Sequence, residues 1–193
     1  MKIKIFKFKN INSTNDKAIK IIKNQNFDSG LVYSLIQKKG KGRYGRRWVS
    51  LKGNFFGTFF LKIKKNYPTF EEFNLINVKL IILILKKYFK IKKISFKAPN
   101  DILINKKKVC GILQEIVTKK ESKYLVIGIG LNLISNPLIN NYPTTNIYDE
   151  TKKKPNLDHL LKIIIKHYEK IINQLRNNKY LSFDNKNINI FSN

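Results

Sequence analysis

The sequence predicts a domain of the α+β class, in which strands and helices share one core. Apolar runs typical of strands lie at residues 2–11, 30–37, 54–63 and 123–133, and a polar turn at 105–107 predicts a hairpin within 94–118. Helical spacing behind a capping signal occurs at 69–90 and 157–175. With 193 residues, 42% of them hydrophobic, the chain can bury one substantial core.

The charge balance is strongly basic. There are 39 Lys and Arg against 12 Asp and Glu, a formal net charge of +27. Such an excess is typical of nucleic-acid binding. Lysine nevertheless lies along the whole chain, and the residues with A/T-rich codons, Lys, Asn and Ile, are abundant everywhere. Base composition is therefore a sufficient cause, and we predict no DNA binding, although the charge favours encounter with acidic partners.

Cysteine usage and hydropathy predict a cytoplasmic protein. The single cysteine, Cys110, excludes an internal disulfide and a zinc site built from cysteines. Residues 1–12 alternate lysine with isoleucine or phenylalanine and lack the apolar block of a secretory signal. The longest apolar run, 80–85, is too short to span a bilayer. We expect one domain over 1–177 and a short polar tail over 178–193, without membrane association.

The first strand, 2–11, alternates apolar and cationic residues and is followed by N-S-T-N-D. Asn12 or Ser13 can cap a helix whose apolar face includes Ala18, Ile19 and Ile22. The neutral hydroxyl and amide groups of this segment can also bind a neutral polar ring. The residues alone do not decide between a helix cap and a binding site. The next strand, 30–37, ends at Gln37.

Residues 37–53 combine glycines with lysines and arginines and contain Trp48, the one tryptophan of the chain. Glycine lets a backbone approach a ligand closely, and arginine donors fit phosphate and carboxylate oxygens. A flat ring beside such a loop can stack on a base. The pattern predicts a flexible loop that closes over a polyanionic ligand, with a solvated basic loop or a nucleic-acid patch as the alternative.

The helix at 69–90 begins with the capping box T-x-x-E at Thr69. Its spacing predicts a buried face that consists of Phe73, Ile76, Leu80, Leu83 and either Ile84 or Leu85. We find no functional signal in this helix. The helix at 157–175, capped by Asn156, carries His159 and His167, which we interpret as residues of the helix face and not as metal ligands.

Within 94–118, four polar groups interrupt apolar strands: Lys97, Asn100, Asp101 and Lys108. A buried charge is costly unless it is paired, so Asp101 either pairs with a lysine or ligates Mg²⁺. Cys110 is interpreted as a small core residue. In the strand 123–133, Gly128 and Gly130 predict close approach by a ligand or another backbone, or a bulge. Residues 134–155, with three prolines, are predicted to form a loop.

The loop sequence GKGRYGRRWVSLKGN closely resembles the G-R-G-R-x-G-R-x-W-x-S-x-x-G-x-N signature of biotin protein ligases. The blocks STN, KAPND with KVCGILQE, and GIGLN resemble the family's other motifs, in the family's order, between Ile3 and Leu133. The resemblance implies the catalytic core shared with lipoate ligases. That core is a mixed β-sheet backed by helices, related to class II aminoacyl-tRNA synthetases. We expect no N-terminal helix-turn-helix, no C-terminal barrel and no repressor function.

The implied reaction uses ATP, Mg²⁺ and the substrate biotin. Biotin and ATP give biotinyl-5′-AMP, and the biotinyl group then passes to a lysine of the biotin carboxyl carrier protein of acetyl-CoA carboxylase. The enzyme is expected to be a monomer or a homodimer. The alternatives are a lipoate or octanoate ligase on the same fold, a basic nucleic-acid-binding protein, and a degenerate core kept as a scaffold.

The resemblance also implies residue roles. Lys108 and Arg43 are the implied catalytic residues, and Asp101 is the implied Mg²⁺ ligand. Biotin contacts are implied for Ser13, Thr14, Asn15, Gln37, Lys41, Gly42, Arg43, Lys108 and Gly111. Nucleotide contacts are implied for Arg43, Arg46, Trp48, Lys97, Asn100 and Asn132. The chain departs from the family at Lys41, where arginine is usual, and at Ala98, where tryptophan is usual.

Overall fold

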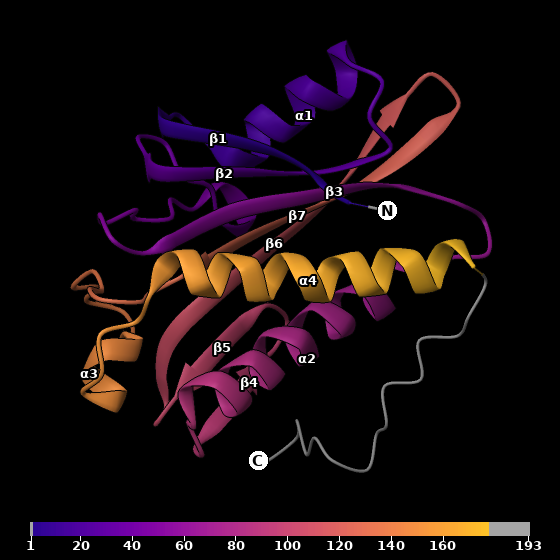
Figure 1. Ribbon diagram of the computed structural model, residues 1–193. Coiled ribbons are helices and arrows are strands. Elements are labelled where there is room, and N and C mark those ends of the chain that lie inside the picture. Colours follow the sequence, from indigo (N-terminus) through magenta and orange to yellow (C-terminus); the bar gives the residue numbers. More distant parts are fainter. Residues whose placement is uncertain (1, 178–193) are drawn as a thin grey trace.

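A computed structural model describes residues 2–177, so the predicted tail, 178–193, lies outside the described residues. A seven-stranded mixed sheet runs through the molecule in the order β1-β2-β3-β7-β6-β5-β4 (Figure 1). The strands β1 and β2 are parallel because the helix α1 (Thr14–Asn24) joins them, and every other pair is antiparallel. The strands are β1 (Lys4–Ile11), β2 (Ser29–Gln37), β3 (Phe55–Ile63), β4 (Ile94–Lys97), β5 (Asp101–Ile104), β6 (Lys107–Lys119) and β7 (Ser122–Leu131).

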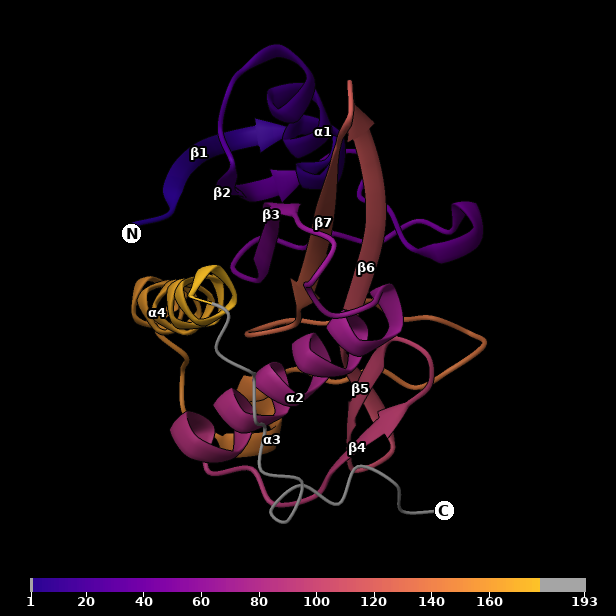
Figure 2. The same cartoon turned by 90° about the vertical axis from the view of Figure 1, so that its right-hand side faces the viewer.

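Helices cover both faces of the sheet. The helices α2 (Phe70–Phe89) and α4 (Leu157–Arg176) pack on one face, whereas α1 packs on the other (Figures 1 and 2). Successive strand residues point to opposite faces. Leu125 therefore joins the core under α2 and α4, while its neighbour Val126 joins the core under α1. This arrangement confirms the α+β class and the mixed sheet backed by helices.

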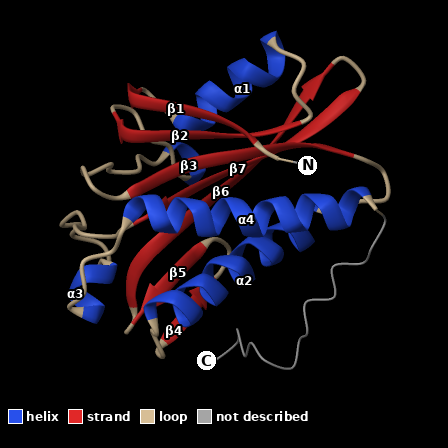
Figure 3. Cartoon of the chain, in the orientation of Figure 1, coloured by secondary structure: helices blue, strands red, loops and turns tan. Residues whose placement is uncertain are grey.

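The predicted elements differ from the structure in three places. The segment 94–118 contains three strands, since a turn with Pro99 separates β4 from β5. A short helix, α3 (Ile147–Thr151), lies within the predicted loop 134–155 and is capped by Asn146. The buried face of α2 includes Ile81 and Ile84, whereas the Leu83 side chain is exposed, so the predicted inward position of Leu83 is wrong. Figure 3 distinguishes the helices from the strands.

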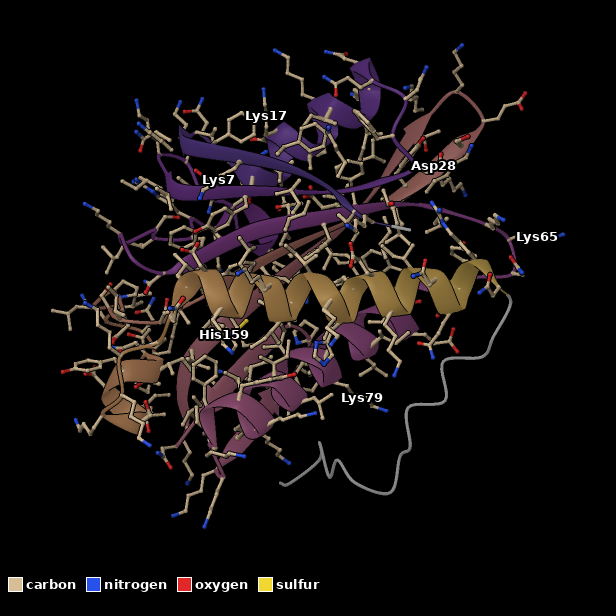
Figure 4. All side chains as sticks on the ribbon, in the orientation of Figure 1. Lys7, Lys17, Asp28, Lys65, Lys79 and His159 are labelled. Atoms are coloured by element: carbon tan, nitrogen blue, oxygen red, sulfur yellow. The ribbon has the colours of Figure 1, made fainter. Side chains whose placement is uncertain are left out.

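The described residues are organised around one sheet. Residues 2–177 contain neither an N-terminal helix-turn-helix nor a second, barrel-shaped unit. Within the same residues, none of the helices combines the length and apolar character that crossing a bilayer requires. Cations lie on many separate elements: Lys7, Lys17, Lys65 and Lys79 all come from different parts of the chain (Figure 4).

A chain of hydrogen bonds that begins in the buried core ties the two helices to the sheet. The Tyr168 hydroxyl of α4 donates to Asn77 Oδ1 of α2 at 2.7 Å, and Asn77 Nδ2 donates to Gln114 Oε1 of β6 at 2.8 Å. Gln114 Nε2 then donates to the Phe70 carbonyl at 2.7 Å. Burial raises the pKa of the Tyr168 hydroxyl, which keeps it protonated as a donor.

The Tyr168→Phe variant is therefore expected to lose about 1–3 kcal/mol of unfolding free energy, because Asn77 Oδ1 is left buried without a donor. Urea unfolding at an unchanged m-value measures the loss. Tyr148→Phe, at an exposed tyrosine of α3, is the matched control and is expected to change stability by less than about 0.5 kcal/mol. Equal stabilities of the two variants would contradict the role of this chain.

Candidate functional site

A cavity of about 280 Å³ opens on the face of the sheet that carries α1. Its floor is formed by alternate residues of two paired strands, and Gly111 of β6 lies directly opposite Gly130 of β7. All the predicted site residues except one line it: Ser13, Thr14, Asn15, Gln37, Lys41, Gly42, Arg43, Arg46, Trp48, Lys97, Asn100, Asp101, Lys108 and Gly111. The fold thus brings four separate sequence blocks to one place.

One end of the cavity carries a network of neutral hydroxyl and amide groups, called here the neutral network, which is anchored to one carboxylate. The Thr14 backbone N–H and hydroxyl both donate to Gln37 Oε1, at 2.7 and 2.9 Å. The Thr58 hydroxyl of β3 lies 2.8 Å from Thr14 Oγ1 and 2.7 Å from Asn15 Oδ1. Asn15 Nδ2 donates to the Glu115 carboxylate at 2.5 Å. The network fixes the orientation of each amide and hydroxyl before any ligand arrives.

The start of α1 both caps the helix and lines the cavity. The Ser13 hydroxyl accepts from the Asp16 N–H and caps α1, as predicted, while the buried Ser13 side chain also lines the cavity. Gln37 Nε2 donates to Ser50 Oγ at 3.1 Å, which links the end of β2 to the loop that follows. The residue that caps α1 thus also lines the cavity.

The glycines of β6 and β7 make room for side chains and not for a second backbone. A Cβ added at Gly128 would lie 2.1 Å from Asn15 Oδ1. A Cβ at Gly130 or Gly111 would lie 2.3 or 2.7 Å from atoms of the Trp48 ring. The indole therefore rests flat on two adjacent strands, and its buried Nε1 has no hydrogen-bond partner in the described part of the chain.

The glycine-rich loop folds back on itself as a small hairpin. The Trp48 N–H donates to the Gly40 carbonyl at 2.9 Å, and the Gly42 N–H donates to the Arg46 carbonyl at 2.7 Å. The apex residue, Tyr44, has φ 54°, a left-handed conformation that is uncommon for a bulky side chain, and it is 85% exposed. The hairpin places the loop's cations around the cavity and its tryptophan on the floor.

The loop cations have different environments. Arg43 Nη2 donates to the Tyr44 hydroxyl at 3.1 Å, and Arg47 Nη2 donates to the Lys38 carbonyl at 3.0 Å. Lys41, in the place of the usual arginine, forms an ion pair with Asp16 of α1 at 2.5 Å. In this structure Lys41 thus ties the loop to the first turn of α1, although its side chain still borders the cavity.

Lys108 lies at the cavity wall beside Trp48. Its Nζ is 2.8 Å from Asp101 Oδ1, and the two side chains are only 15% and 23% exposed. The same ammonium lies 5.5 Å from the Trp48 ring centroid and 5.2 Å from that of Tyr142. The structure therefore shows the lysine pairing that the sequence left open for Asp101. Residues 2–177 contain no cluster of three or more His, Cys, Asp and Glu side chains suited to a metal.

Cys110 is a core residue, as predicted. Its side chain is fully buried under α2 and α4, on the face of the sheet opposite the cavity. Burial, reinforced by the nearby Asp101 carboxylate, raises the pKa of the Cys110 thiol well above its usual value. A thiol of this kind stays protonated at neutral pH and is a poor nucleophile.

Asn132 is the predicted site residue that does not line the main cavity. It borders a small recess that shares Trp48, Lys108 and Tyr142 with the cavity. Its Nδ2 donates to the Thr145 carbonyl at 3.1 Å, while its buried Oδ1 has no partner among the described residues. Thr58 and Tyr142 were missed from the sequence and carry no local signal, because only the strand pairing and the loop path bring them here. Ser50 and Glu115 were also missed as site residues, although they stand within the motifs GKGRYGRRWVSLKGN and KVCGILQE.

A family model described as "Biotin/lipoate A/B protein ligase family" matches residues 7–132, well over half of the chain. The chain belongs to the biotin/lipoate A/B protein ligase family. This membership confirms the resemblance found in the loop and strand motifs. The match runs from within β1 to just past the end of β7, and therefore covers most of the sheet and almost every residue of the cavity.

Two relatives from this family show how far the likeness extends. The biotin–[acetyl-CoA-carboxylase] ligase of Paracoccus denitrificans is 32% identical over 127 residues, 65% of this chain and 52% of that protein. The bifunctional ligase/repressor BirA of Bacillus subtilis is 31% identical over 137 residues, 69% of this chain and 41% of that protein. The chain therefore spans about half the length of these relatives or less.

The solved structures support the same fold. The biotin protein ligase from Aquifex aeolicus in complex with biotin and ATP superposes with a TM-score of 0.73 at 24% identity, covering 91% of this chain and 73% of that one. The P. falciparum protein LipL1 in complex with lipoate superposes with a TM-score of 0.59 at 13% identity, covering 88% of this chain and 63% of that one. Within the family, the fold by itself does not distinguish biotin from lipoate.

Proposed function

We propose that this chain is an ATP-dependent biotin protein ligase that transfers biotin to a lysine of the biotin carboxyl carrier protein of acetyl-CoA carboxylase. The observation that carries the proposal is the combination within one cavity of a neutral hydrogen-bonding network and a mostly buried lysine. The Paracoccus relative bears the name of this activity. The loop and strand motifs of the cavity match the biotin branch of the family in sequence.

The neutral network suits the ureido ring of biotin. A ureido group has two N–H donors and one carbonyl acceptor and carries no charge, so it needs partners that are also uncharged. Thr14, Asn15 and Gln37 supply hydroxyl and amide groups that are already oriented: Thr58 contacts Thr14 and Asn15, and Thr14 in turn donates to Gln37. Preorganised partners lower the cost of ordering on binding. The far end of a linear acyl chain, as in lipoate or octanoate, has no N–H or carbonyl group that could pair with such a network.

The cationic side of the cavity suits the first reaction step. A biotin carboxylate oxygen attacks the α-phosphorus of ATP, the bond from that phosphorus to the β-bridging oxygen breaks, and pyrophosphate leaves with that oxygen. Two anions must meet, so fixed cations are needed. Lys108, Arg43 and Arg46 all border the cavity, and we assign Lys108 and Arg43 to this role. Lys97 is an additional cation on the nucleotide side.

The remaining roles follow from position. In the second step the amine of the carrier's lysine attacks the biotinyl carbonyl carbon, and AMP leaves as the C–O bond to it breaks. Trp48 packs on the bound adenylate, and the loop around it excludes water from the mixed anhydride. When bound, Mg²⁺ neutralises phosphate charge, and Asp101 and Asn100 are the oxygen donors present beside the cavity. Asn132 contributes to the nucleotide side through the recess that it shares with Trp48.

Biotin-dependent exchange of labelled pyrophosphate into ATP tests the proposal, because it reports the first step without a carrier. We expect exchange with biotin and at least about a hundredfold less with lipoate or octanoate at equal concentration, since the polar network discriminates against a ligand that leaves it unpaired. Equal rates with lipoate would favour a lipoate ligase. No exchange with either acid would favour a degenerate core.

A further inference from the structure

Two runs of lysine that are far apart in sequence, 90–93 and 153–154, meet around one open groove. The groove has a volume of about 700 Å³ and lies between the C-terminal end of α2, the end of β5 and the segment that joins α3 to α4. These elements lie together at the lower side of the molecule in both views (Figures 1 and 2). The exposed lysines that line it, called here the groove lysines, are Lys90, Lys92, Lys93, Lys153 and Lys154.

Hydrogen bonds hold the three segments against one another. The Asn105 N–H donates to the Lys93 carbonyl at 3.2 Å, and Asn105 Nδ2 donates to Glu150 Oε2 at 2.6 Å. The other oxygen of Glu150 accepts from the Thr145 hydroxyl at 2.7 Å. Asn105 therefore bridges the α2–β4 segment to α3, and the convergence of the lysine runs is built into the fold.

The positive charge of the groove is not neutralised within the chain. Glu150 is the one carboxylate among its described lining residues, and both of its oxygens are engaged in neutral hydrogen bonds. Within residues 2–177, none of the groove lysines forms an ion pair. Base composition accounts for the number of lysines, whereas the fold decides which of them meet. Five like charges around one groove repel one another and attract a polyanion.

The groove adjoins the cavity. The turn between β5 and β6 contributes Asn105 to the groove and the next residue, Lys106, to the cavity. A protein that sits in the groove is therefore in reach of the β5–β6 turn, whose next residue lines the cavity. A lysine substrate faces a difficulty here, since its ammonium group must approach a cavity already bordered by Arg43, Arg46 and Lys108. Negative charge elsewhere on the substrate protein would offset that repulsion.

We propose that the groove lysines dock an acidic face of the carrier domain, so that its target lysine enters the adjacent cavity; this inference rests on the proposed ligase function. Attraction between the two surfaces speeds encounter and orients the carrier before its lysine reaches the adenylate. The groove acts in the second step only. Biotin activation does not involve it.

Charge reversal at four groove lysines separates this role from the first step. The test variant carries Lys92→Glu, Lys93→Glu, Lys153→Glu and Lys154→Glu. A matched control carries the same charge change at Lys20, Lys23, Lys62 and Lys123, which are exposed on α1 and at the end of the sheet away from the cavity. The substrate is the unbiotinylated carrier domain of acetyl-CoA carboxylase from the same organism. Circular dichroism and urea unfolding check that both variants are folded.

We expect both variants to retain wild-type pyrophosphate exchange, and the groove variant to show a KM for the carrier raised at least about tenfold, with at most about a twofold rise in the control. The difference should shrink as salt is added. A carrier KM that is unchanged, or raised equally in both variants, would overturn the proposal. Loss of binding to a 20-base-pair DNA duplex with an unchanged carrier KM would assign the groove to nucleic acid instead.

Failure of the ligase function itself gives a different pattern. In that case the wild-type chain shows no biotin-dependent exchange. Fluorescence anisotropy of the labelled carrier domain then still measures docking without catalysis. Carrier binding that is weakened in the groove variant and retained in the control supports the groove, and equal binding by all three proteins refutes it.

Discussion

Replacing Lys108 by alanine is expected to lower the rate of biotin-dependent pyrophosphate exchange by at least about a hundredfold, the size of effect seen when one fixed charge-stabilising donor is removed from a site. The ammonium group borders the cavity and is mostly buried, so water screens its charge poorly. Without it, the biotin carboxylate and the α-phosphate meet with one fixed cation fewer in the cavity. Lys107→Ala, at an exposed lysine one residue earlier on the same strand, is the matched control and should retain activity.

The structure adds a stability effect that the sequence did not predict. Lys108 is the partner of Asp101, so the alanine variant leaves a carboxylate that is only 23% exposed without its ion pair. We expect the double variant Lys108→Ala, Asp101→Asn to recover most of the lost unfolding free energy and none of the exchange activity. Full activity in either variant would remove Lys108 from the mechanism. Activity restored together with stability would show that the lysine serves folding alone.

Gly128→Ala is expected to raise the KM for biotin about tenfold to a hundredfold, which corresponds to one or two site hydrogen bonds. The added Cβ would lie 2.1 Å from Asn15 Oδ1, so the Asn15 amide must leave its present position. That movement breaks its contacts with Thr58 and Glu115 and disorganises the neutral end of the cavity. Biotin titration of the exchange rate measures the change.

Gly30→Ala is the matched control for this prediction. It also adds a methyl group to a crowded strand glycine, 2.4 Å from the Phe60 ring, but in the core under α1 and not among the cavity residues. We expect Gly30→Ala to lower stability and to leave the KM for biotin unchanged. A biotin KM that is equal to wild type in Gly128→Ala, with the fold retained, would show that Asn15 is not held in place for biotin.

Much of the fold could be predicted because its signals are local. The capping box at Thr69, the cap at Ser13 and the turn at Asn105 depend on a few neighbouring residues, and each is present as expected. The buried face of α2 was harder, because Leu83 is apolar and correctly spaced but lies where no partner covers it. The segment 94–118 is split into three strands because the chain turns at Pro99, between β4 and β5. The sequence alone does not show where that turn falls.

The cavity could be predicted only in part, because some of its contacts join segments that are far apart in the sequence. The motifs named the residues of four blocks, and fourteen of the fifteen predicted positions line one cavity. Gly128 and Gly130 were expected to admit a ligand or a backbone, whereas the structure uses them to seat Asn15 and Trp48. Thr58 is an ordinary strand residue in sequence, and Glu115 belongs to the KVCGILQE motif without being predicted as a site residue. The contacts of both with Asn15 arise from the approach of a distant segment.

The sequence by itself determined the class of the fold, the family and most of the residues that border the cavity, because periodicity, caps and motif spacing are properties of neighbouring residues. The tertiary structure alone decided that Asp101 pairs with Lys108, that Trp48 lies across two strands, and that two lysine runs border one groove. Each of these depends on the distance between side chains far apart in the chain, and burial and charge act through distance in space and not through separation in sequence.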